Sequence, residues 1–333
     1  MHRRRSRTGR CRRWRTSVPR NEIARRVVTT CSGAVGTILV ASLVIFAGLA
    51  AAPGDPVAQI LGAKATDEGR AQLRAKLGLD DPLLERYWHW LTSALRGDFG
   101  TSLTARQDVT DLLAPRLMTT VLLVVMAALL IIVVGIGLGI VGGVSSRSRA
   151  PIAVLVALGI AVPSFVAANA LIGVFAVRLG WFPTFGSGTG FADSVWHLVL
   201  PSIALSVGYG AYVTQLTSAA VAEEADKEYV LTARGRGVPA LVVLRHHTLR
   251  NAALPVLTAS GLAVAGLVAG TVIVEQAFAV DGIGALLVRS VSTKDYPVVV
   301  AVSMIIVVVF VVITTIIDLI QVALDPRERT QAA

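Results

Sequence analysis

The chain has 333 residues, of which 54% are hydrophobic and only 16% are charged, and its mean hydropathy is +0.69. Soluble domains usually carry about 25% charged residues, so this composition predicts a membrane protein and excludes the collagenous, disordered and disulfide-rich classes. The net charge of +10 comes from one place, because 11 of the 31 basic residues lie in the first 26 positions and the remaining chain is balanced.

The arginine-rich tail, residues 1–26, is therefore the first predicted element. We interpret it as a cytoplasmic anchor on anionic membrane lipid, with a nucleic-acid-binding arm as the alternative. Because the balanced remainder has no basic surplus, the chain as a whole is not expected to bind nucleic acid.

Six apolar stretches without Asp, Glu, Lys or Arg follow the tail. Each is long enough for a helix to cross about 30 Å of hydrocarbon, which takes about 20 residues. Backbone amides in lipid must be paired within their own segment, so the fold class is predicted to be all-α with six transmembrane helices. The stretches are residues 27–54, 117–146, 150–177, 194–222, 251–274 and 296–317.

These stretches divide the chain into five parts. The predicted parts are the cytoplasmic tail 1–26, transmembrane helix 1 at 27–52, an extracytoplasmic helical segment at 53–116, a membrane core at 117–323 and a cytoplasmic C-terminal tail at 324–333. The first stretch could also be a secretory signal peptide, but its apolar core exceeds the usual ~7–15 residues.

The distribution of basic residues predicts the orientation of the helices. With the N-terminus inside, 20 Lys and Arg residues face the cytoplasm and 11 face the other side. Both termini are therefore predicted to be cytoplasmic.

The extracytoplasmic segment is predicted to hold helices. Thr66 is a candidate N-cap for a helix that stops at Gly78, and Asp81 with Pro82 is typical of the start of a second. A third helix begins at Val109 and runs into the next span. Their apolar faces are interpreted as packing surfaces, with docking of an outside partner as the alternative.

A long inside loop, residues 223–254, connects the fourth and fifth spans. Tyr229, Thr232 and Ala233 continue a helix, the glycines at 235 and 237 break it, and Pro239 starts another helix. The pattern predicts two helices lying flat beneath the membrane, suited to a groove in another protein or to the lipid surface.

Several residues interrupt the apolar stretches. Pro163-Ser164 is expected to break the third span and Pro201-Ser202 the fourth. Glu275 and Asp318 lie near span ends, where we expect both carboxylates to reach interfacial water, with a proton relay as the alternative.

Motifs for chemistry are missing from the sequence. None of the four lysines follows a glycine or precedes Ser or Thr, so no phosphate-binding P-loop is present. No metal-binding spacing and no nucleophile with a nearby His and acid stands out. We therefore predict a protein that is not an enzyme and that holds no metal or cofactor of its own.

Short fragments spread over the chain resemble one known family, the B-type permease subunit of the ABC importers of the dipeptide/oligopeptide/nickel group. Each fragment alone is weak, but their order and their placement relative to the six spans are specific. The fragments are Pro53-Gly54-Asp55-Pro56, Leu77-Gly78-Leu79-Asp80, Gly97-Asp98-Phe99-Gly100, Tyr229 to Gly237, Leu249 to Val256, Glu275, Phe278, Gly282-Ile283-Gly284, Asp295-Tyr296-Pro297, Asp318 and Asp325-Pro326-Arg327.

This resemblance implies an importer core of the MetI-like type that pairs with a second, C-type permease as a heterodimer. It also implies two ATP-binding subunits, which bind ATP and Mg, and an extracytoplasmic substrate-binding protein, at a bacterial inner membrane. The loop 223–254 is implied to carry the coupling helix that docks on the ATPase. The implied coupling residues are Glu228, Tyr229, Thr232, Ala233, Arg234, Gly235, Arg236, Gly237, Asn251, Leu254 and Pro255.

The substrate implied by the resemblance is a di- or oligopeptide, with nickel, glutathione or another small solute as alternatives. The residues along the substrate pathway are not indicated by any motif. From another class, a secondary transporter driven by an ion gradient remains the alternative, although it predicts inverted repeats and mid-membrane charges that are not evident.

Overall fold

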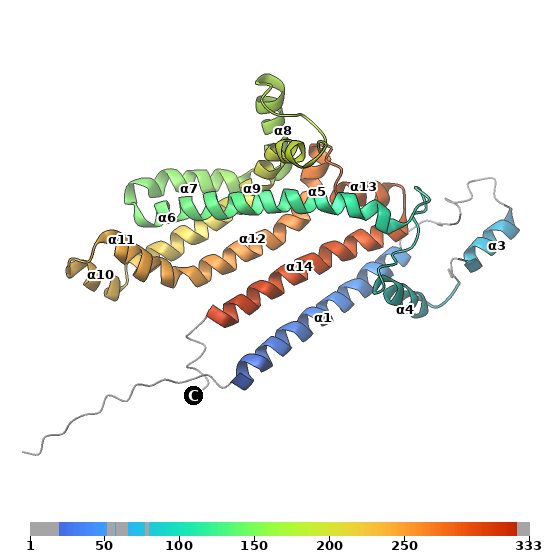
Figure 1. Ribbon diagram of the computed structural model, residues 1–333, viewed down its shortest axis with the longest axis horizontal. Coiled ribbons are helices and arrows are strands. Elements are labelled where there is room, and N and C mark those ends of the chain that lie inside the picture. Colours follow the sequence, from blue (N-terminus) through green and yellow to red (C-terminus); the bar gives the residue numbers. More distant parts are fainter. Residues whose placement is uncertain (1–19, 52–56, 58–65, 77–79, 325–333) are drawn as a thin grey trace, which may run out of the picture.

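A computed structural model describes residues 20–51, 57, 66–76 and 80–324, and its regular elements in those ranges are helices (Figure 1). One isolated antiparallel bridge joins Thr101 to Asp108. The tail residues 1–19 and the fragments 53–56, 77–79 and 325–327 lie outside the described residues.

The described helices fall into two groups along the chain. Three of them, labelled η, are π-helical segments that continue an α-helix. The first group is α1 (Arg20–Ala50), α3 (Asp67–Lys76), α4 (Leu83–Ala94), α5 (Val109–Leu130), η1 (Ile131–Gly135), α6 (Ile136–Val144), α7 (Ser146–Ala161), α8 (Ser164–Leu171) and η2 (Ile172–Arg178). The second group is α9 (Phe191–Ala225), α10 (Glu228–Gly235), α11 (Ala240–Val243), η3 (Leu244–Thr248), α12 (Leu249–Ala277), α13 (Ile283–Ser292) and α14 (Tyr296–Leu324).

Among the described residues, five continuous helices are long and apolar enough to cross a membrane. A sixth span exists if α7 with α8 and η2 is counted as one, and this pair is bent by 101°. The bend lies at Pro163, where the predicted break of the third span is confirmed. Proline fixes its own φ and restricts the residue before it, and α7 ends at Ala161.

The predicted break at Pro201 is wrong, because α9 continues through this proline from Phe191 to Ala225. Pro201 is buried between neighbouring helices, and the Ser202 hydroxyl donates a 2.8 Å hydrogen bond to the carbonyl of Val199 in the same turn. Packing and local hydroxyl bonding of this kind allow proline inside membrane helices.

The helices expected between spans one and two are present, with one correction at their starts. The backbone N–H of Gly69 donates to the Thr66 hydroxyl at 3.2 Å, as expected of a cap. The Asp81 cap is wrong, because Pro82 occupies the N-cap position of α4 and no side chain caps that helix. The helix expected from Val109 begins there as α5. Gly78, the expected stop of α3, lies outside the described residues.

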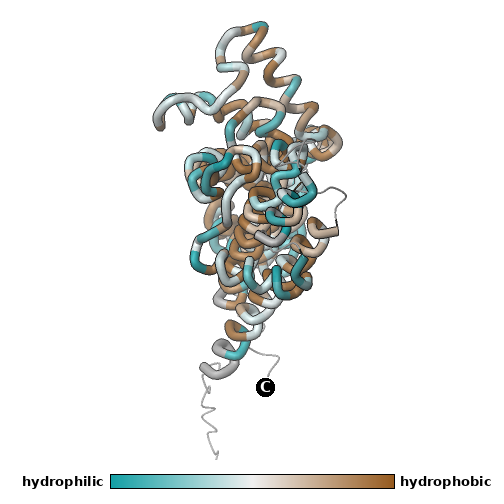
Figure 2. The backbone as a smooth tube through the Cα atoms, turned by 90° about the vertical axis from the view of Figure 1, so that its right-hand side faces the viewer, coloured by the Kyte–Doolittle hydropathy of each residue, from teal (hydrophilic) through white to brown (hydrophobic). Residues whose placement is uncertain are grey.

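Helices α9 and α12 pack along each other at the centre, with α5 and α6 against α9, α14 against α12, and α1 on the far side of α14 (Figure 1). The α10 end is the end of the molecule that carries α10 and α11, and the α13 end is the opposite one, with α4 and α13. Seen along the long axis of the molecule, many of the helix turns are hydrophobic (Figure 2). Large apolar side chains such as Val133, 69% exposed, lie on outward faces, as expected of lipid-facing helices.

Candidate functional site

The region with the implied coupling residues begins at α10, a short helix that projects at the α10 end (Figure 1). The helix closes at Gly237, which has a φ of +79°. The N–H of Gly237 bonds the carbonyl of Arg234 at 2.9 Å, and the N–H of Val238 bonds that of Ala233 at 3.2 Å. This pair of bonds is a Schellman cap, which requires the left-handed backbone that glycine adopts without strain. The predicted break therefore lies at Gly237, whereas Gly235 is still helical.

The second predicted flat helix is not a separate element. From Ala240 the chain runs through α11 and η3 into α12 as one apolar helix of 38 residues that ends at Ala277. Asn251, Leu254 and Pro255 consequently lie within the first turns of α12 rather than in a loop. Pro255 does not stop this helix. The predicted loop 223–254 therefore extends too far, because the helix already begins at Ala240.

A chain of hydrogen bonds anchors α10 to its two neighbours. The Asn251 side chain in α12 donates to the Tyr229 hydroxyl at 2.7 Å, and the Tyr229 hydroxyl donates to the carboxylate of Glu224 at the end of α9. Lys227 also donates to Glu224 at 2.5 Å. Glu224 is buried, and its carboxylate links α9 directly to Tyr229 of α10 and, through Tyr229, to Asn251 of α12. The sequence alone did not indicate a role for this carboxylate.

The electrostatics of this cluster follow from that carboxylate. Partial burial and the hydrogen bond to Glu224 raise the pKa of Tyr229 above its ordinary value. The hydrogen bond to Glu224 also raises the pKa of Lys227. Tyr229 therefore remains a neutral donor and Lys227 a cation at physiological pH, and both protons stay in the cluster.

The other implied coupling residues are spread along the exposed part of the segment. Glu228 is in the first turn of α10, and exposed apolar residues lie beside exposed arginines. A surface that combines apolar contact area with guanidinium groups is typical of a docking site for another protein. The exposed residues are Leu231, Thr232, Arg234, Gly235, Arg236, Gly237, Leu241 and Val242, and Ala233 is half-buried.

At the opposite end, Glu275 does not reach interfacial water and is fully buried, so that expectation is wrong. Its carboxylate accepts hydrogen bonds from the Thr120 hydroxyl at 2.6 Å and from the backbone N–H of Ala285 at 2.9 Å. The Thr120 hydroxyl also accepts from the N–H of Ile283 at 3.0 Å. Glu275 and Thr120 together satisfy the unpaired amides at the start of α13 and join it to α5 and α12.

A second buried carboxylate, Asp295, lies just past the other end of α13. It accepts from the Ser102 hydroxyl at 2.5 Å, the Leu103 N–H at 3.0 Å, and the Thr104 N–H and hydroxyl at 3.1 and 2.6 Å. Burial by itself raises the pKa of Asp295, but these hydrogen bonds outweigh burial and lower it. Asp295 therefore fastens the loop before α5 to the start of α14.

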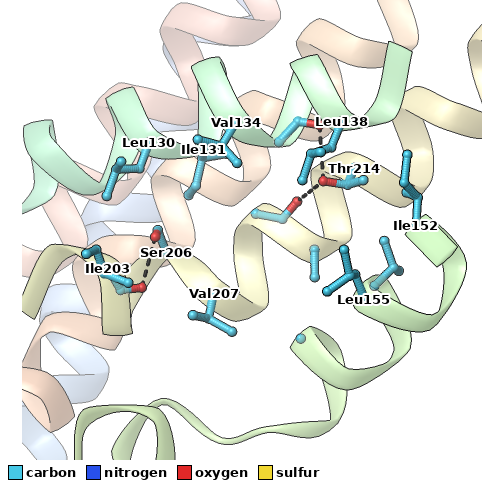
Figure 3. Close-up of a pocket in the computed structure, with 15 residues that line it drawn as sticks. Leu130, Ile131, Val134, Leu138, Ile152, Leu155, Ile203, Ser206, Val207 and Thr214 are labelled. Carbon is cyan, nitrogen blue, oxygen red and sulfur yellow. Dashed lines mark hydrogen bonds between the residues drawn. The ribbon is translucent and has the colours of Figure 1, made fainter. Parts of the chain in front are cut away.

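A cavity of about 380 Å³ lies between α7, α9 and the helix formed by α5, η1 and α6 (Figure 3). Its walls are aliphatic side chains such as Ile131 and Leu155. The two hydroxyls on its wall are already used, because Thr214 donates to the Gly135 and Gly210 carbonyls and Ser206 to the Ile203 carbonyl. The cavity therefore offers no converging polar groups for a polar ligand. Within the described residues, no group of three or more His, Cys, Asp or Glu side chains could hold a metal ion.

Comparisons with known proteins cover most of the chain. Two curated relatives are each 36% identical to it: a probable peptide ABC transporter permease protein, y4tP, of Sinorhizobium fredii, and the glutathione transport system permease protein GsiC of Escherichia coli K12. The alignments span 92% and 91% of this chain and 98% of each relative. Residues 23–124 match the N-terminal family of binding-protein-dependent transport system membrane components. Residues 135–330, which include α10 and its anchors, match the main family, and the chain therefore belongs to the binding-protein-dependent transport system inner membrane components.

Proposed function

We propose that this permease forms half of the translocation pathway of an ATP-driven importer of di- or oligopeptides. A second, C-type permease supplies the other half, two ATP-binding subunits hold ATP and Mg, and an extracytoplasmic protein delivers the substrate. The family supports this assembly, and the exposed, capped α10 with its anchor at Glu224 is the observation that carries the role of this chain. The α10 end, with both termini, faces the cytoplasm.

In this proposal α10 is the coupling helix. An ATPase that moves α10 also moves the ends of α9 and α12, because Tyr229 is bonded to Glu224 on one and Asn251 on the other. These two helices pack along each other at the centre of the molecule, so their displacement changes the shape of the core. The exposed Arg234 and Arg236 are placed to donate to acidic or carbonyl groups of the ATPase.

The test uses the complete complex reconstituted in liposomes, with ATP hydrolysis measured with and without loaded binding protein. Gly237→Pro removes the Schellman donor and cannot adopt a positive φ, and Arg234→Glu reverses a docking charge. We expect both variants to insert normally but to lose most of the stimulation by loaded binding protein.

Gly235→Ala is the matched control. This glycine is helical and a Cβ there meets nothing within 4 Å, so alanine should preserve or slightly improve α10. Stimulation that is unchanged in both Gly237→Pro and Arg234→Glu would contradict the coupling role.

The peptide substrate is proposed from the relatives, one of which carries the name of a peptide permease and the other of a glutathione permease. A strain lacking this chain should fail to grow on di- or oligopeptides as the sole nitrogen source and should recover when the chain is restored. Normal growth on peptides together with lost uptake of glutathione or nickel would select one of those alternatives instead.

A further inference from the structure

Helix α4 lies beside the later half of α1 and is fixed there by specific contacts (Figure 1). The hydroxyls of Tyr87 and Ser42 are hydrogen-bonded at 2.7 Å, and both residues are buried. The centroid of the Phe46 ring lies 5.7 Å from that of Tyr87 and 5.9 Å from that of Trp90. Ser42 and Phe46 belong to the candidate membrane span Arg25–Ala50. Part of α4 is therefore packed directly on a membrane-spanning helix.

The side chains of α4 are sorted around the helix into three faces. Tyr87 and Trp90 lie on the face that contacts α1. At 100° per residue, Leu84 and Trp88 share the adjoining face, and their side chains are 68% and 63% exposed. The third face is polar and carries Glu85, His89 and Thr92. An apolar face opposite a polar one is typical of a helix that lies in the membrane–water interface.

The lipid-facing surface of α1 adjoins the exposed apolar face of α4. Leu39 and Leu43 lie on α1 next to the residues that α4 contacts, and both are exposed. Tryptophan is enriched where membrane meets water, because its ring is apolar and its N–H can donate to a headgroup. The charged residues of α4 lie on another face, so the stripe of Leu84 and Trp88 lacks the guanidinium groups that are common in protein interfaces. Membrane lipid is the occupant that this chemistry fits.

The contacts with α1 also give the direction of α4. Tyr87 contacts α1 at Ser42, and Trp90 contacts it at Phe46, one turn closer to the end of α1. The helix therefore rises toward the membrane surface along its length. Leu84 lies deeper than Trp88, and Leu95, past the end of α4, lies on the water side.

We propose that α4 is an interfacial helix that inserts Leu84 and Trp88 into the lipid leaflet on the α13 side of the membrane. The polar face with Glu85 and His89 remains in water, and α1 supports the helix from behind. Lipid then holds the segment between the first two spans against the membrane. This inference rests on the membrane location of the chain and not on its substrate or on the coupling role of α10.

The test uses the full-length chain, purified with the other subunits of its transporter and reconstituted in liposomes. Cys11 and Cys31 are changed to Ser, and one new cysteine carries an environment-sensitive nitrobenzoxadiazole dye. Trp88→Cys and Leu84→Cys probe the stripe, and His89→Cys, an exposed neighbour on the polar face, is the matched control. Dye in the bilayer is quenched by lipid with a nitroxide on its acyl chain, and dye in water is quenched by iodide. We expect nitroxide lipid to remove most of the emission at positions 84 and 88 and iodide to remove little, with the opposite result at position 89.

Two results would overturn the proposal. Iodide quenching at positions 84 and 88 as strong as at position 89 would place the stripe in water, including the case in which a loaded binding protein, added later, covers it. Protection of both positions from iodide and from nitroxide lipid would show that another subunit covers the stripe. If Trp88→Cys does not yield folded protein by size-exclusion chromatography, Leu84→Cys decides between the same outcomes.

Discussion

Gly139 brings two membrane helices into close contact. A Cβ at this position of α6 would lie 2.4 Å from the Cβ of Thr217 and 2.9 Å from the carbonyl oxygen of Thr214, both on α9. Glycine removes that Cβ and lets the backbones approach, which is how small residues work in helix pairs without a hydrophobic driving force. Gly137 on the same helix has nothing within 4 Å of its Cβ position and plays no such part.

This contrast gives a prediction about α6. Gly139→Ala should destabilise the protein by about 1–3 kcal/mol, because the added methyl group forces α6 away from α9. Gly137→Ala should be neutral or slightly stabilising, since alanine favours the helix. Thermal unfolding of both variants in detergent measures the difference, and equal midpoints would mean that the α6–α9 contact is looser than described.

Single residues also mark the limit of what the sequence could predict. Tyr229 and Asn251 were both identified from family motifs, but nothing in their spacing indicated that Asn251 donates to the Tyr229 hydroxyl or that Tyr229 in turn donates to Glu224. Glu275 was placed near water because it is close to the end of an apolar stretch. The hydropathy pattern does not show that Glu275 is enclosed by Thr120, which comes from another helix, and by the start of α13.

Among the elements, α13 is fastened at both ends by carboxylates. Glu275 bonds its first turn, and Asp295, just past its last, accepts four hydrogen bonds from residues 102–104. The pKa of Asp295 is below its ordinary value of 3.8, so its ionised form is favoured by folding. Its contribution to stability is complete above pH 3.8 and is lost as the pH falls through the lower value in the folded protein.

Asp295→Asn should therefore cost about 1–3 kcal/mol at neutral pH, because the amide cannot accept the same set of bonds. The difference in thermal midpoint between wild type and variant should be constant from pH 7 to pH 5 and should shrink below about 3.8. Melting curves in detergent across that range measure it. A gap that persists unchanged at the lowest pH would show that the carboxylate charge is not what holds the loop.

The positions of the helices were predicted better than the breaks and connections between them. Long apolar stretches and the helix starts at Thr66 and Val109 follow from hydropathy and capping chemistry, and the structure has them. A proline in the sequence did not by itself predict a break in a helix. A sharp bend lies at Pro163, whereas α9 continues through Pro201, and the packing around the two prolines differs. The prediction of a separate helix after Pro239 was also wrong. The structure continues from α11 through η3 into α12, and this continuity depends on a π-helical segment that has no sequence signature.

At the scale of the whole molecule, the two ends differ in chemistry and are proposed to face different compartments. A cysteine-free background, with Cys11 and Cys31 changed to Ser, allows a direct test. Leu95→Cys reports the α13 end, where Leu95 is 80% exposed, and Arg236→Cys reports the exposed turn at the α10 end.

In intact spheroplasts, a membrane-impermeant maleimide should label the cysteine at 95 and should reach the one at 236 only after the membrane is opened. The positive charge of the short loops beside α10 and α6 is the physical reason. Gel shift after labelling measures both. Labelling of position 236 in sealed cells, without labelling of 95, would reverse the orientation and place α10 away from any cytosolic ATPase.

The helix from Ala240 to Ala277 joins the two ends of the permease without an intervening loop. Its 38 residues, at a rise of 1.5 Å each, span about 57 Å. Its first residue follows the turn at Gly237, where an ATPase is proposed to dock. Near its other end, Glu275 accepts a hydrogen bond from the start of α13. Because no loop interrupts this helix, we expect a tilt imposed at its first end to displace its second end, so that docking on one side of the membrane would reposition α13 on the other.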